Sequence, residues 1–405
     1  MPTEKLEFTG HGGDTLAARL DLPQGPAKAT ALFAHCFTCS KDIAAARRIA
    51  ARLAGQGIAV LRFDFTGLGH SGGEFANTHF TSNVADLVAA ARHLEGEGRA
   101  PALLVGHSLG GAAVLAAAAQ IPSVKAVVTI GAPADPGHVI HNFGCKIDEI
   151  RAAGSAEVSL GGRPFTIRRE FIDDVSAAKL TAAVSGLKRA LLVLHAPRDQ
   201  TVGIENAGEI FGAARHPKSF VTLDDADHLL SRAEDAEYAA EVIAAWSRRY
   251  LGLKDDPPRA GAPEGIVRVS EADPAGFLQD VAAGPRHHLL ADEPVSHGGT
   301  DAGPSPYQFL SAGLGACTAM TARMYARRKG WPLEHVSVDV THDKVHAADC
   351  ADCPDKTARI DEFRRVIRLE GELDADQRAK LMEIADKCPV HRTLEGQIRV
   401  RTEAA

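Results

Sequence analysis

The stretch that decides the fold of the first half is Leu103-Leu104-Val105-Gly106-His107-Ser108-Leu109-Gly110-Gly111. An apolar run that predicts a buried strand leads into Gly-x-Ser-x-Gly, and small apolar residues typical of a helix follow. The two glycines of the motif leave room for a sharp turn, which would hold Ser108 in a strained and exposed conformation. A serine hydroxyl is a poor nucleophile unless a base removes its proton. A histidine and an orienting carboxylate are therefore expected further along the chain.

The candidate acid and base each follow a later apolar run. Asp199 comes just after one predicted strand, and His228 comes shortly after the next. Their order along the chain, Ser then Asp then His, is the order that this type of strand–turn–helix motif requires. Asp135 and Asp227 are the alternative acids, and Asp227 is disfavoured because adjacent side chains rarely converge.

Residues 1–253 alternate continuous apolar runs with amphipathic helical patterns. Such alternation predicts an α/β domain with a mostly parallel sheet covered on both faces. The segment 136–175 interrupts the pattern with one possible helix and a hairpin around Gly161-Gly162, as a small lid would. The predicted strands are 5–9 and 16–22, which form an opening hairpin, and 30–34, 58–65, 102–106, 125–130, 190–195 and 219–223.

Two further stretches carry a family resemblance. The loop His35-Cys36-Phe37-Thr38-Cys39-Ser40 and the strand and turn Phe63-Asp64-Phe65-Thr66-Gly67-Leu68-Gly69-His70-Ser71 resemble those of the α/β-hydrolase superfamily, over about residues 1–252. The tetrahedral oxyanion of such an enzyme needs two N–H donors, which we assign to the backbones of Leu109 and Phe37. Cys36 stands where that family usually has glycine. We interpret it as a small packing residue, with a redox-sensitive thiol as the alternative.

This resemblance implies hydrolysis of a small carboxylic ester, thioester or related acyl bond through an acyl-enzyme at Ser108. Serine at the turn argues against a dehalogenase, which would have aspartate there. Acyl transfer and the use of peroxide in place of water stay open, because the motif does not separate them. No cofactor and no metal is predicted for this site.

The second half has a different character. Residues 254–264, rich in proline and charge, predict a linker, and residues 265–405 predict an α+β domain. Alternate residues are apolar in two predicted strands, one with Val336, Val338 and Val340, the other with Phe363, Ile367 and Leu369 around Arg365. Two helices are predicted, near 306–328 and 376–387.

The first of these helices contains Ala316-Cys317, and the second is followed by Cys388-Pro389-Val390. The predicted apolar stripe of the first helix contains Phe309, Leu310, Leu314, Cys317 and Met324. Over about residues 265–403 this pattern resembles the OsmC/Ohr family of thiol-dependent peroxidases. The resemblance implies that Cys317 attacks an organic hydroperoxide, that Cys388 resolves the sulfenic acid, and that a dithiol reductant restores both. It also implies an intertwined homodimer.

Two positions depart from the active members of that family. Tyr307, followed by Gln308, stands where they have glutamate, and no arginine lies at the expected distance upstream. Arg286 and His297 are the possible substitutes. A cysteine in the middle of a helix needs a nearby cation to be a thiolate at neutral pH. Peroxidase activity is therefore left open.

Composition excludes several other classes of function. At roughly 150 residues per domain, the 405 residues predict two or three domains. The 45 Lys and Arg against 52 Asp and Glu give a net charge of −7, which offers no support for nucleic-acid binding. No apolar run approaches the length of a membrane span, and the start MPTEKLEFTG lacks a secretory pattern. Seven cysteines in such a chain predict a cytoplasmic protein whose thiols are mostly reduced.

Cys350 and Cys353, with His342 and His346 upstream, could ligate a metal. One Cys-x-x-Cys supplies only two ligands, so we interpret this segment as a loop between strands, with redox exchange as the alternative. Two functional hypotheses remain for the whole chain. Either a serine hydrolase is fused to an active OsmC-like peroxidase, or the OsmC-like domain only dimerises or binds a ligand. A third would couple the two sites, the hydrolase releasing oxidised acyl chains whose hydroperoxides the thiols reduce.

Overall fold

The computed structural model describes residues 2–23, 26–160, 162–253, 261–346 and 359–404. The chain divides into two compact units, Met1–Pro257 and Pro258–Ala405. Most of the predicted linker, residues 254–260, lies outside the described residues.

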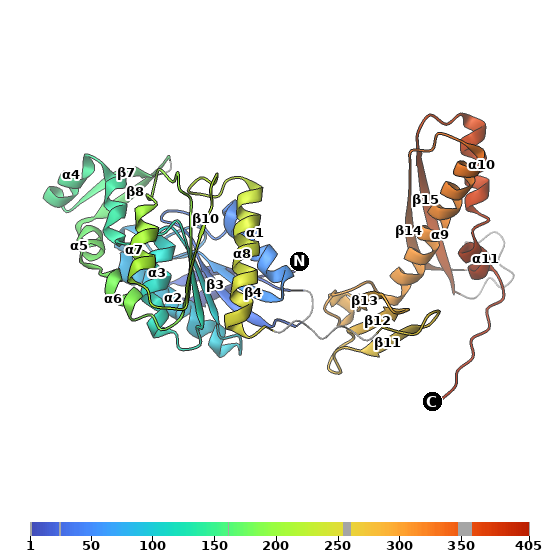
Figure 1. Cartoon of the computed structure of the whole chain (residues 1–405), viewed down its shortest axis with the longest axis horizontal. Helices are drawn as coiled ribbons and strands as arrows, with labels where there is room; N and C mark the ends of the chain where they lie inside the picture. The colour runs from blue at the N-terminus through green and yellow to red at the C-terminus, as the bar shows by residue number, and fades with distance from the viewer. Residues whose placement is uncertain (1, 24–25, 161, 254–260, 347–358, 405) are drawn as a thin grey trace. The chain divides into compact units, whose positions relative to one another are not determined.

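The first unit is built on an eight-stranded sheet with the order β1-β2-β4-β3-β5-β6-β9-β10 (Figure 1). The opening hairpin pairs antiparallel, and β2 joins β4 antiparallel, whereas every pair from β4 to β10 is parallel. The α/β class and the opening hairpin are confirmed. The strands are β1 (Thr3–Thr9), β2 (Thr15–Asp21), β3 (Ala29–Ala34), β4 (Ile58–Phe63), β5 (Leu103–His107), β6 (Ala126–Ile130), β9 (Ala190–His195) and β10 (Lys218–Thr222).

Helices cover both faces of this sheet because the central strands are apolar on both sides. On β3, Leu32 and Ala34 belong to one core, and Ala31 and Phe33 belong to the other. α1 and α8 pack on the second core, and α2, α3 and α7 pack on the first (Figure 1). These helices are α1 (Ala44–Gly55), α2 (Phe80–Gly96), α3 (Leu109–Ala117), α7 (Glu205–Ala213) and α8 (Ala233–Leu251), and short 3-10 turns lie at η1 (Phe75–Asn77) and η2 (Ala118–Gln120).

The predicted lid is present between β6 and β9. The antiparallel pair of β7 (Ser155–Leu160) and β8 (Arg163–Arg168) confirms the predicted hairpin. The other lid elements are η3 (Pro136–Phe143), α4 (Lys146–Ala153), α5 (Arg169–Ala177) and α6 (Leu180–Ser185).

The second unit is α+β. A long helix, α9 (Pro306–Lys329), packs on the antiparallel pair β14 (His335–His346) and β15 (Arg359–Glu370) and on two shorter helices, α10 (Ala375–Ala385) and α11 (Pro389–Glu395). The sequence analysis did not predict α11 or the three-stranded antiparallel sheet that opens this unit. That sheet consists of β11 (Val267–Glu271), β12 (Gln279–Ala283) and β13 (His287–Ala291), and a 3-10 turn η4 (Val295–His297) follows it.

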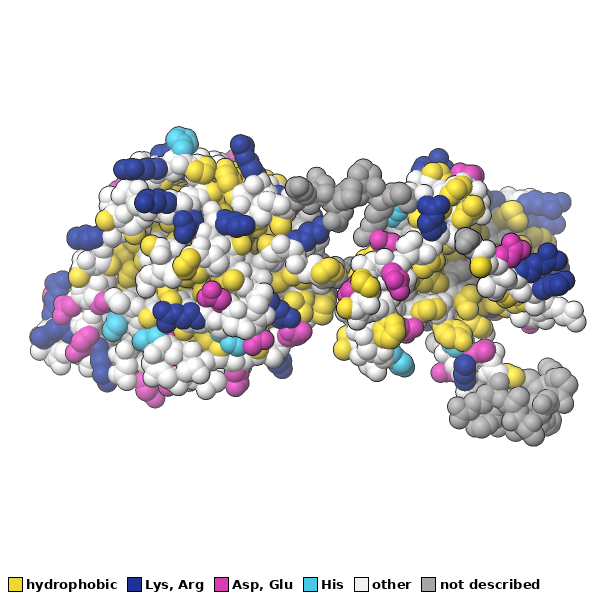
Figure 2. Space-filling view, turned by 90° about the horizontal axis from the view of Figure 1, so that it is seen from below, with side chains coloured by type: hydrophobic (Ala, Val, Ile, Leu, Met, Phe, Trp, Pro, Cys, Tyr) yellow, Lys and Arg dark blue, Asp and Glu magenta, His cyan; other side chains and the backbone are white. Residues whose placement is uncertain are grey.

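The core of the second unit is small, and many large apolar side chains are exposed on it (Figure 2). The residues of the predicted apolar stripe of α9 differ in burial. Leu314 is buried with Thr318, whereas Leu310 and Met324 are exposed and Cys317 is half-buried. The predicted stripe therefore runs along the boundary between the buried and the exposed face of α9.

Candidate functional site

The turn between β5 and α3 presents Ser108 as the sequence predicts. Ser108 has φ 55° and ψ −126°, a backbone conformation that L-residues rarely adopt. A side chain at Gly106 would place its Cβ 2.3 Å from the carbonyl oxygen of Gly110, and one at Gly110 would place it 2.4 Å from that of Ala34. Both glycines are therefore required for β5, α3 and the end of β3 to approach this closely.

Ser108, His228 and Asp199 lie in hydrogen-bonding contact. His228 Nε2 is 3.0 Å from Ser108 Oγ, and His228 Nδ1 is 2.6 Å from Asp199 Oδ2. A carboxylate only accepts hydrogen bonds, so Nδ1 carries the ring hydrogen. That leaves Nε2 as the acceptor for the serine hydroxyl, which is the arrangement a general base needs.

Asp199 is held as a charged acceptor. Burial alone would raise the pKa of its carboxyl, but hydrogen bonds from His228 and from the N–H groups of Val202 and Thr201 hold that pKa below its usual value. The alternative acids lie elsewhere. Asp135 accepts from the N–H of Gly137 at the start of η3, and Asp227 accepts from the N–H of Ser231.

His107, the residue before Ser108, contacts both the backbone and the ring of His228. It is buried, its Nε2 donates to the backbone carbonyl of His228 over 2.6 Å, and the two rings are 5.3 Å apart. Burial and then the nearby His228 lower the pKa of His107 to about 4, against the opposing effect of this hydrogen bond. The ring is therefore neutral under ordinary conditions and acts as a fixed donor.

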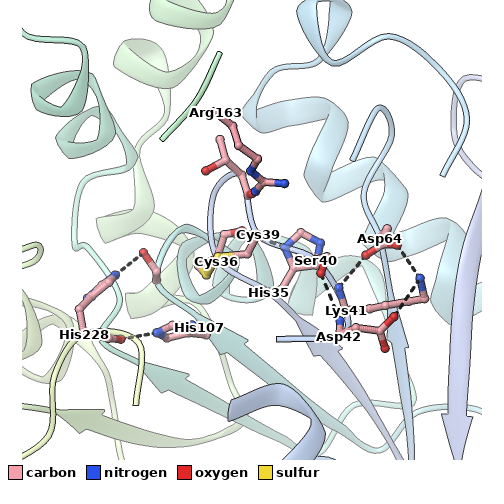
Figure 3. The surroundings of a disulfide bond; sticks show 12 residues. His35, Cys36, Cys39, Ser40, Lys41, Asp42, Asp64, His107, Arg163 and His228 are labelled. Carbon is pink, nitrogen blue, oxygen red and sulfur yellow. Dashed lines mark hydrogen bonds and ion pairs between the residues drawn. A yellow bond between two sulfur atoms is a disulfide. The ribbon is translucent and has the colours of Figure 1, made fainter. Parts of the chain in front are cut away.

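The predicted oxyanion loop carries a disulfide. Cys36 and Cys39 are bonded to each other, so the expectation of reduced thiols is wrong for this pair (Figure 3). Cys36 is buried, as expected for a packing residue, but its sulfur packs as part of a cross-link. The signal was present in the sequence as Cys36-x-x-Cys39, a spacing short enough for the two side chains to meet across one turn.

Phe37 and Leu109, the two predicted donors, line one largely apolar pocket. No hydrogen bond from the backbone N–H of either residue to another group is found in the described part of the chain. The ring of Phe37 lies 5.3 Å from Phe171, 5.8 Å from Phe75 and 6.3 Å from Phe143, measured between ring centroids. Aromatic side chains of the lid therefore pack directly on the predicted oxyanion loop.

The two cysteines predicted for the site of the second unit differ in burial. Cys317 and Cys388 are both free thiols, and no hydrogen bond joins them among the described residues. Cys388 is buried, and its Sγ lies 3.6 Å from Thr318 Oγ1 and accepts the N–H of His391 over 3.3 Å. Cys388 therefore contacts α9 at Thr318, the residue after Cys317.

An arginine that the sequence analysis missed lies beside Cys388. Nη1 of Arg365, on β15, donates to Thr318 Oγ1 over 3.0 Å. Its Nη2 donates to Asp386 Oδ1 over 2.8 Å and lies 2.8 Å from His391 Nδ1. This guanidinium carries a fixed positive charge. It is linked to the Cys388 thiol through the side chain of Thr318, which contacts both.

The signal for Arg365 was the strand pattern itself. Phe363, Arg365, Ile367 and Leu369 occupy alternate positions, so they share one face of β15. A cation on an otherwise apolar face needs a buried or half-buried partner, and here the partners come from α9 and from the segment after α10.

The positions that depart from the active OsmC/Ohr members have structural roles here. Tyr307 stacks on His342 with ring centroids 4.2 Å apart, and Gln308 closes a capping box with Ser305 at the start of α9. In the described part of the chain, no hydrogen bond or ion pair links the possible substitutes Arg286 and His297 to either thiol, and His297 pairs with the neighbouring Ser296.

Cys350 and Cys353 lie outside the described residues, as does the side chain of His346, so the candidate metal ligands there have no structural account. Within the described ranges, no three His, Cys, Asp or Glu side chains group as metal ligands would. Over the same ranges, no helix has the length and apolar character needed to cross a membrane.

Comparison with known proteins identifies the family of each unit. The family model of the serine aminopeptidases S33 matches residues 25–147, and that of OsmC-like proteins matches residues 298–403. The esterase domain of a protein from Rhodothermus marinus is 52% identical, with a TM-score of 0.53, over 62% of this chain and 100% of that domain. The chain is an α/β-hydrolase fused to an OsmC-like domain. Both resemblances found in the sequence are thereby confirmed.

More distant structures share only the fold of the hydrolase unit. Est1E from Butyrivibrio proteoclasticus, solved with ferulic acid, is 19% identical with a TM-score of 0.55, over 60% of this chain and 99% of its own. The mouse α/β hydrolase domain-containing protein 10 is 21% identical with a TM-score of 0.51, over 61% of this chain and 99% of its own. Among curated proteins, no sequence matches this fusion significantly.

Proposed function

We propose that the hydrolase unit cleaves small carboxylic esters through an acyl-enzyme on Ser108. The observation that carries the proposal is the continuous contact from Ser108 Oγ through the His228 ring to Asp199. The 52% identity to an esterase domain supports the same class of substrate. The side chains around Phe37 and Leu109 are largely apolar, which favours an uncharged acyl group at this site.

In the proposed reaction, His228 Nε2 takes the hydroxyl proton as Ser108 Oγ attacks the ester carbonyl. The N–H groups of Phe37 and Leu109 donate to the oxyanion that forms. His228 then gives the proton to the departing alcohol, and the acyl group remains on Ser108. Water, deprotonated by His228, releases the acid and restores the serine. Asp199 stays ionised throughout and stabilises the imidazolium.

The test compares substitutions at the two candidate acids and at the nucleophile. Ser108→Ala should lower kcat for a short aryl ester by about 10⁴–10⁶-fold, and Asp199→Asn should lower it by about 10⁴-fold. Asp135→Asn, at the alternative acid, is the matched control and should retain most of the activity. Turnover by Ser108→Ala at the wild-type rate would refute the proposal, and an Asp135 effect as large as that of Asp199 would reassign the acid.

For the OsmC-like unit, a second candidate activity is thiol-dependent reduction of organic hydroperoxides. The observation that favours it is Arg365, whose charge lies next to the Thr318–Cys388 contact. Cys317 thiolate would attack the peroxide and release an alcohol, and Cys388 would condense with the sulfenic acid to give a disulfide and water. The alternative is that the unit only dimerises or binds a ligand.

Hydroperoxide consumption distinguishes these two possibilities. Wild-type protein supplied with cumene hydroperoxide and a dithiol reductant should consume the peroxide, whereas Cys317→Ser should not. Equal consumption by both proteins would leave dimerisation or ligand binding as the role of this unit.

A further inference from the structure

The disulfide in the oxyanion loop encloses one of the two proposed oxyanion donors. Cys36 and Cys39 are separated by Phe37 and Thr38 alone, so the cross-link closes a four-residue turn that contains the Phe37 N–H. The role proposed for the loop depends on the direction in which that N–H points, because an oxyanion donor acts only when it is aimed at the developing charge.

The direction of the Phe37 N–H is set by the carbonyl of Cys36. Both groups belong to the same planar trans peptide and therefore point in opposite directions. The Cys36 carbonyl accepts the N–H of Cys39 over 3.1 Å and the Nδ1–H of buried His35 over 2.8 Å. One of the two bonds that fix this peptide plane thus comes from the residue at the other end of the disulfide.

Other contacts hold the rest of the loop, at residues further along the chain than this peptide. The Lys41 side chain and N–H both bond Asp64 over 2.6 Å, which fixes the end of the loop. Arg163 of the lid donates to the carbonyl of Thr38, a residue that has φ 59° and is therefore strained. If the disulfide is reduced, the strained backbone of Thr38 can relax. The hydrogen bond from the Cys39 N–H to the Cys36 carbonyl is then no longer held in place by a covalent link between the two side chains.

The two cysteines differ in exposure, so the attack of a reductant is expected at Cys39 first. Cys36 is 4% exposed, whereas Cys39 is only half-buried. A thiolate of a dithiol reductant can attack Cys39 Sγ, which breaks the S–S bond and releases Cys36 as a thiolate that takes up a proton. The second thiol of the reductant then displaces Cys39 and closes its own disulfide. Two electrons and two hydrogens pass from the reductant to the protein.

We propose that Cys36 and Cys39 form a reversible dithiol–disulfide site. Its oxidised form holds the Phe37 N–H in place, and its reduction by a dithiol lowers the rate of ester hydrolysis. The proposal rests on the proposed function, since it assigns Phe37 to the same oxyanion site. It adds a modification site, with a dithiol as the reacting partner.

The test follows ester hydrolysis by the full chain through one redox cycle. Wild-type protein oxidised with diamide, then reduced with dithiothreitol, then oxidised again, is assayed on a short aryl ester after removal of the reagent. Reduction should lower kcat at least about tenfold, towards the 10²–10³-fold cost of losing one oxyanion donor, with a smaller change in KM. Reoxidation should restore it. Alkylation and peptide mass spectrometry report the state of Cys36 and Cys39 at each step.

Three variants separate the possible outcomes. Cys36→Ser/Cys39→Ser should have the kcat of the reduced wild type under both conditions, while Cys145→Ser, at an exposed free thiol of the same unit, should respond as the wild type does. An unchanged or increased kcat on confirmed reduction of the pair would overturn the switch. Ser108→Ala tells the two failures apart, because turnover that survives it would refute the proposed function, whereas Ser108-dependent turnover insensitive to reduction would refute the switch alone.

Discussion

His107 connects Ser108 to His228 through a single buried side chain. It precedes Ser108 in β5, and its Nε2–H holds the carbonyl of His228. No partner for its other ring nitrogen is found in the described part of the chain. A proton on that nitrogen would be buried without a hydrogen bond beside His228, which explains why the pKa falls to about 4.

This lowered pKa predicts a pH dependence of stability. The unfolded chain binds a proton at His107 near its ordinary value of 6.5, whereas the folded chain does so only near 4. The contribution to stability is therefore complete above pH 6.5 and is lost as the pH falls toward 4, at about 1.4 kcal/mol per pH unit. Buried His35, whose pKa burial also lowers, adds a loss of the same sign.

His107→Gln isolates the contribution of His107, because an amide can donate to the His228 carbonyl but does not titrate. The free energy of unfolding, from urea titrations between pH 4.5 and 7, should fall less steeply with decreasing pH in this variant. Trp331→Phe as background leaves Trp246 as the fluorescence reporter of the hydrolase unit, since the chain has two tryptophans. Equal slopes with and without the His107→Gln substitution would show that His107 does not carry the dependence.

At the residue scale, the sequence was sufficient to predict a residue's place in the site when its position after an apolar run and its side-chain chemistry indicate the same role. Ser108, Asp199 and His228 were predictable because each follows an apolar run and the order of the three is fixed by the fold. Arg365 was missed because its partners come from three other segments. The Cys36–Cys39 bond was missed because composition argued for reduced thiols, and that argument says nothing about two cysteines within one turn.

At the scale of elements, the lid hairpin contacts the predicted oxyanion loop. Arg163, at the start of β8, donates to the Thr38 carbonyl, and its guanidinium lies 5.4 Å from the ring of Phe165. Phe165 contacts Phe75, which in turn contacts Phe37. The sequence predicted the hairpin from its Gly-Gly turn, but the aim of its side chains depends on how it folds back over the sheet.

Removing the Arg163 guanidinium should therefore loosen the loop without unfolding the unit. Arg163→Met keeps the apolar stem and should lower kcat for a short aryl ester about threefold to tenfold, the equivalent of one hydrogen bond. Arg168→Met, at the exposed far end of β8, is the matched control and should be unaffected. A pair of variants with equal kcat would show that the lid does not position the loop.

The elements of the second unit were predictable only where they carry strong periodicity. α9, α10 and the β14–β15 pair follow from helical or alternating patterns. The small sheet β11–β13 was not predicted, since its strands are short and the two outer strands, β11 and β13, are largely exposed in the single chain. Such strands lack the buried face from which alternation is recognised.

For the whole molecule, the exposed apolar surface of the OsmC-like unit calls for a covering partner. Leu310, Cys317, Met320 and Met324 follow one side of α9 at helical spacing, and Met320 and Met324 are 70% and 67% exposed. The core beneath α9 is small by comparison. Monomeric proteins rarely leave such a stripe in water, so it supports the proposed homodimer through this unit.

The molar mass of the protein in solution tests the expected homodimer. Light scattering after size-exclusion chromatography should give twice the 42.7 kDa of one chain for the wild type. Met320→Glu/Met324→Glu should shift the mass to that of a monomer, because two charges would be desolvated at the interface. Tyr238→Glu, at an exposed apolar position on α8 of the hydrolase unit, is the control and should stay dimeric. A monomeric wild type, or a double variant that remains dimeric and folded by circular dichroism, would show that this face of α9 is not the interface.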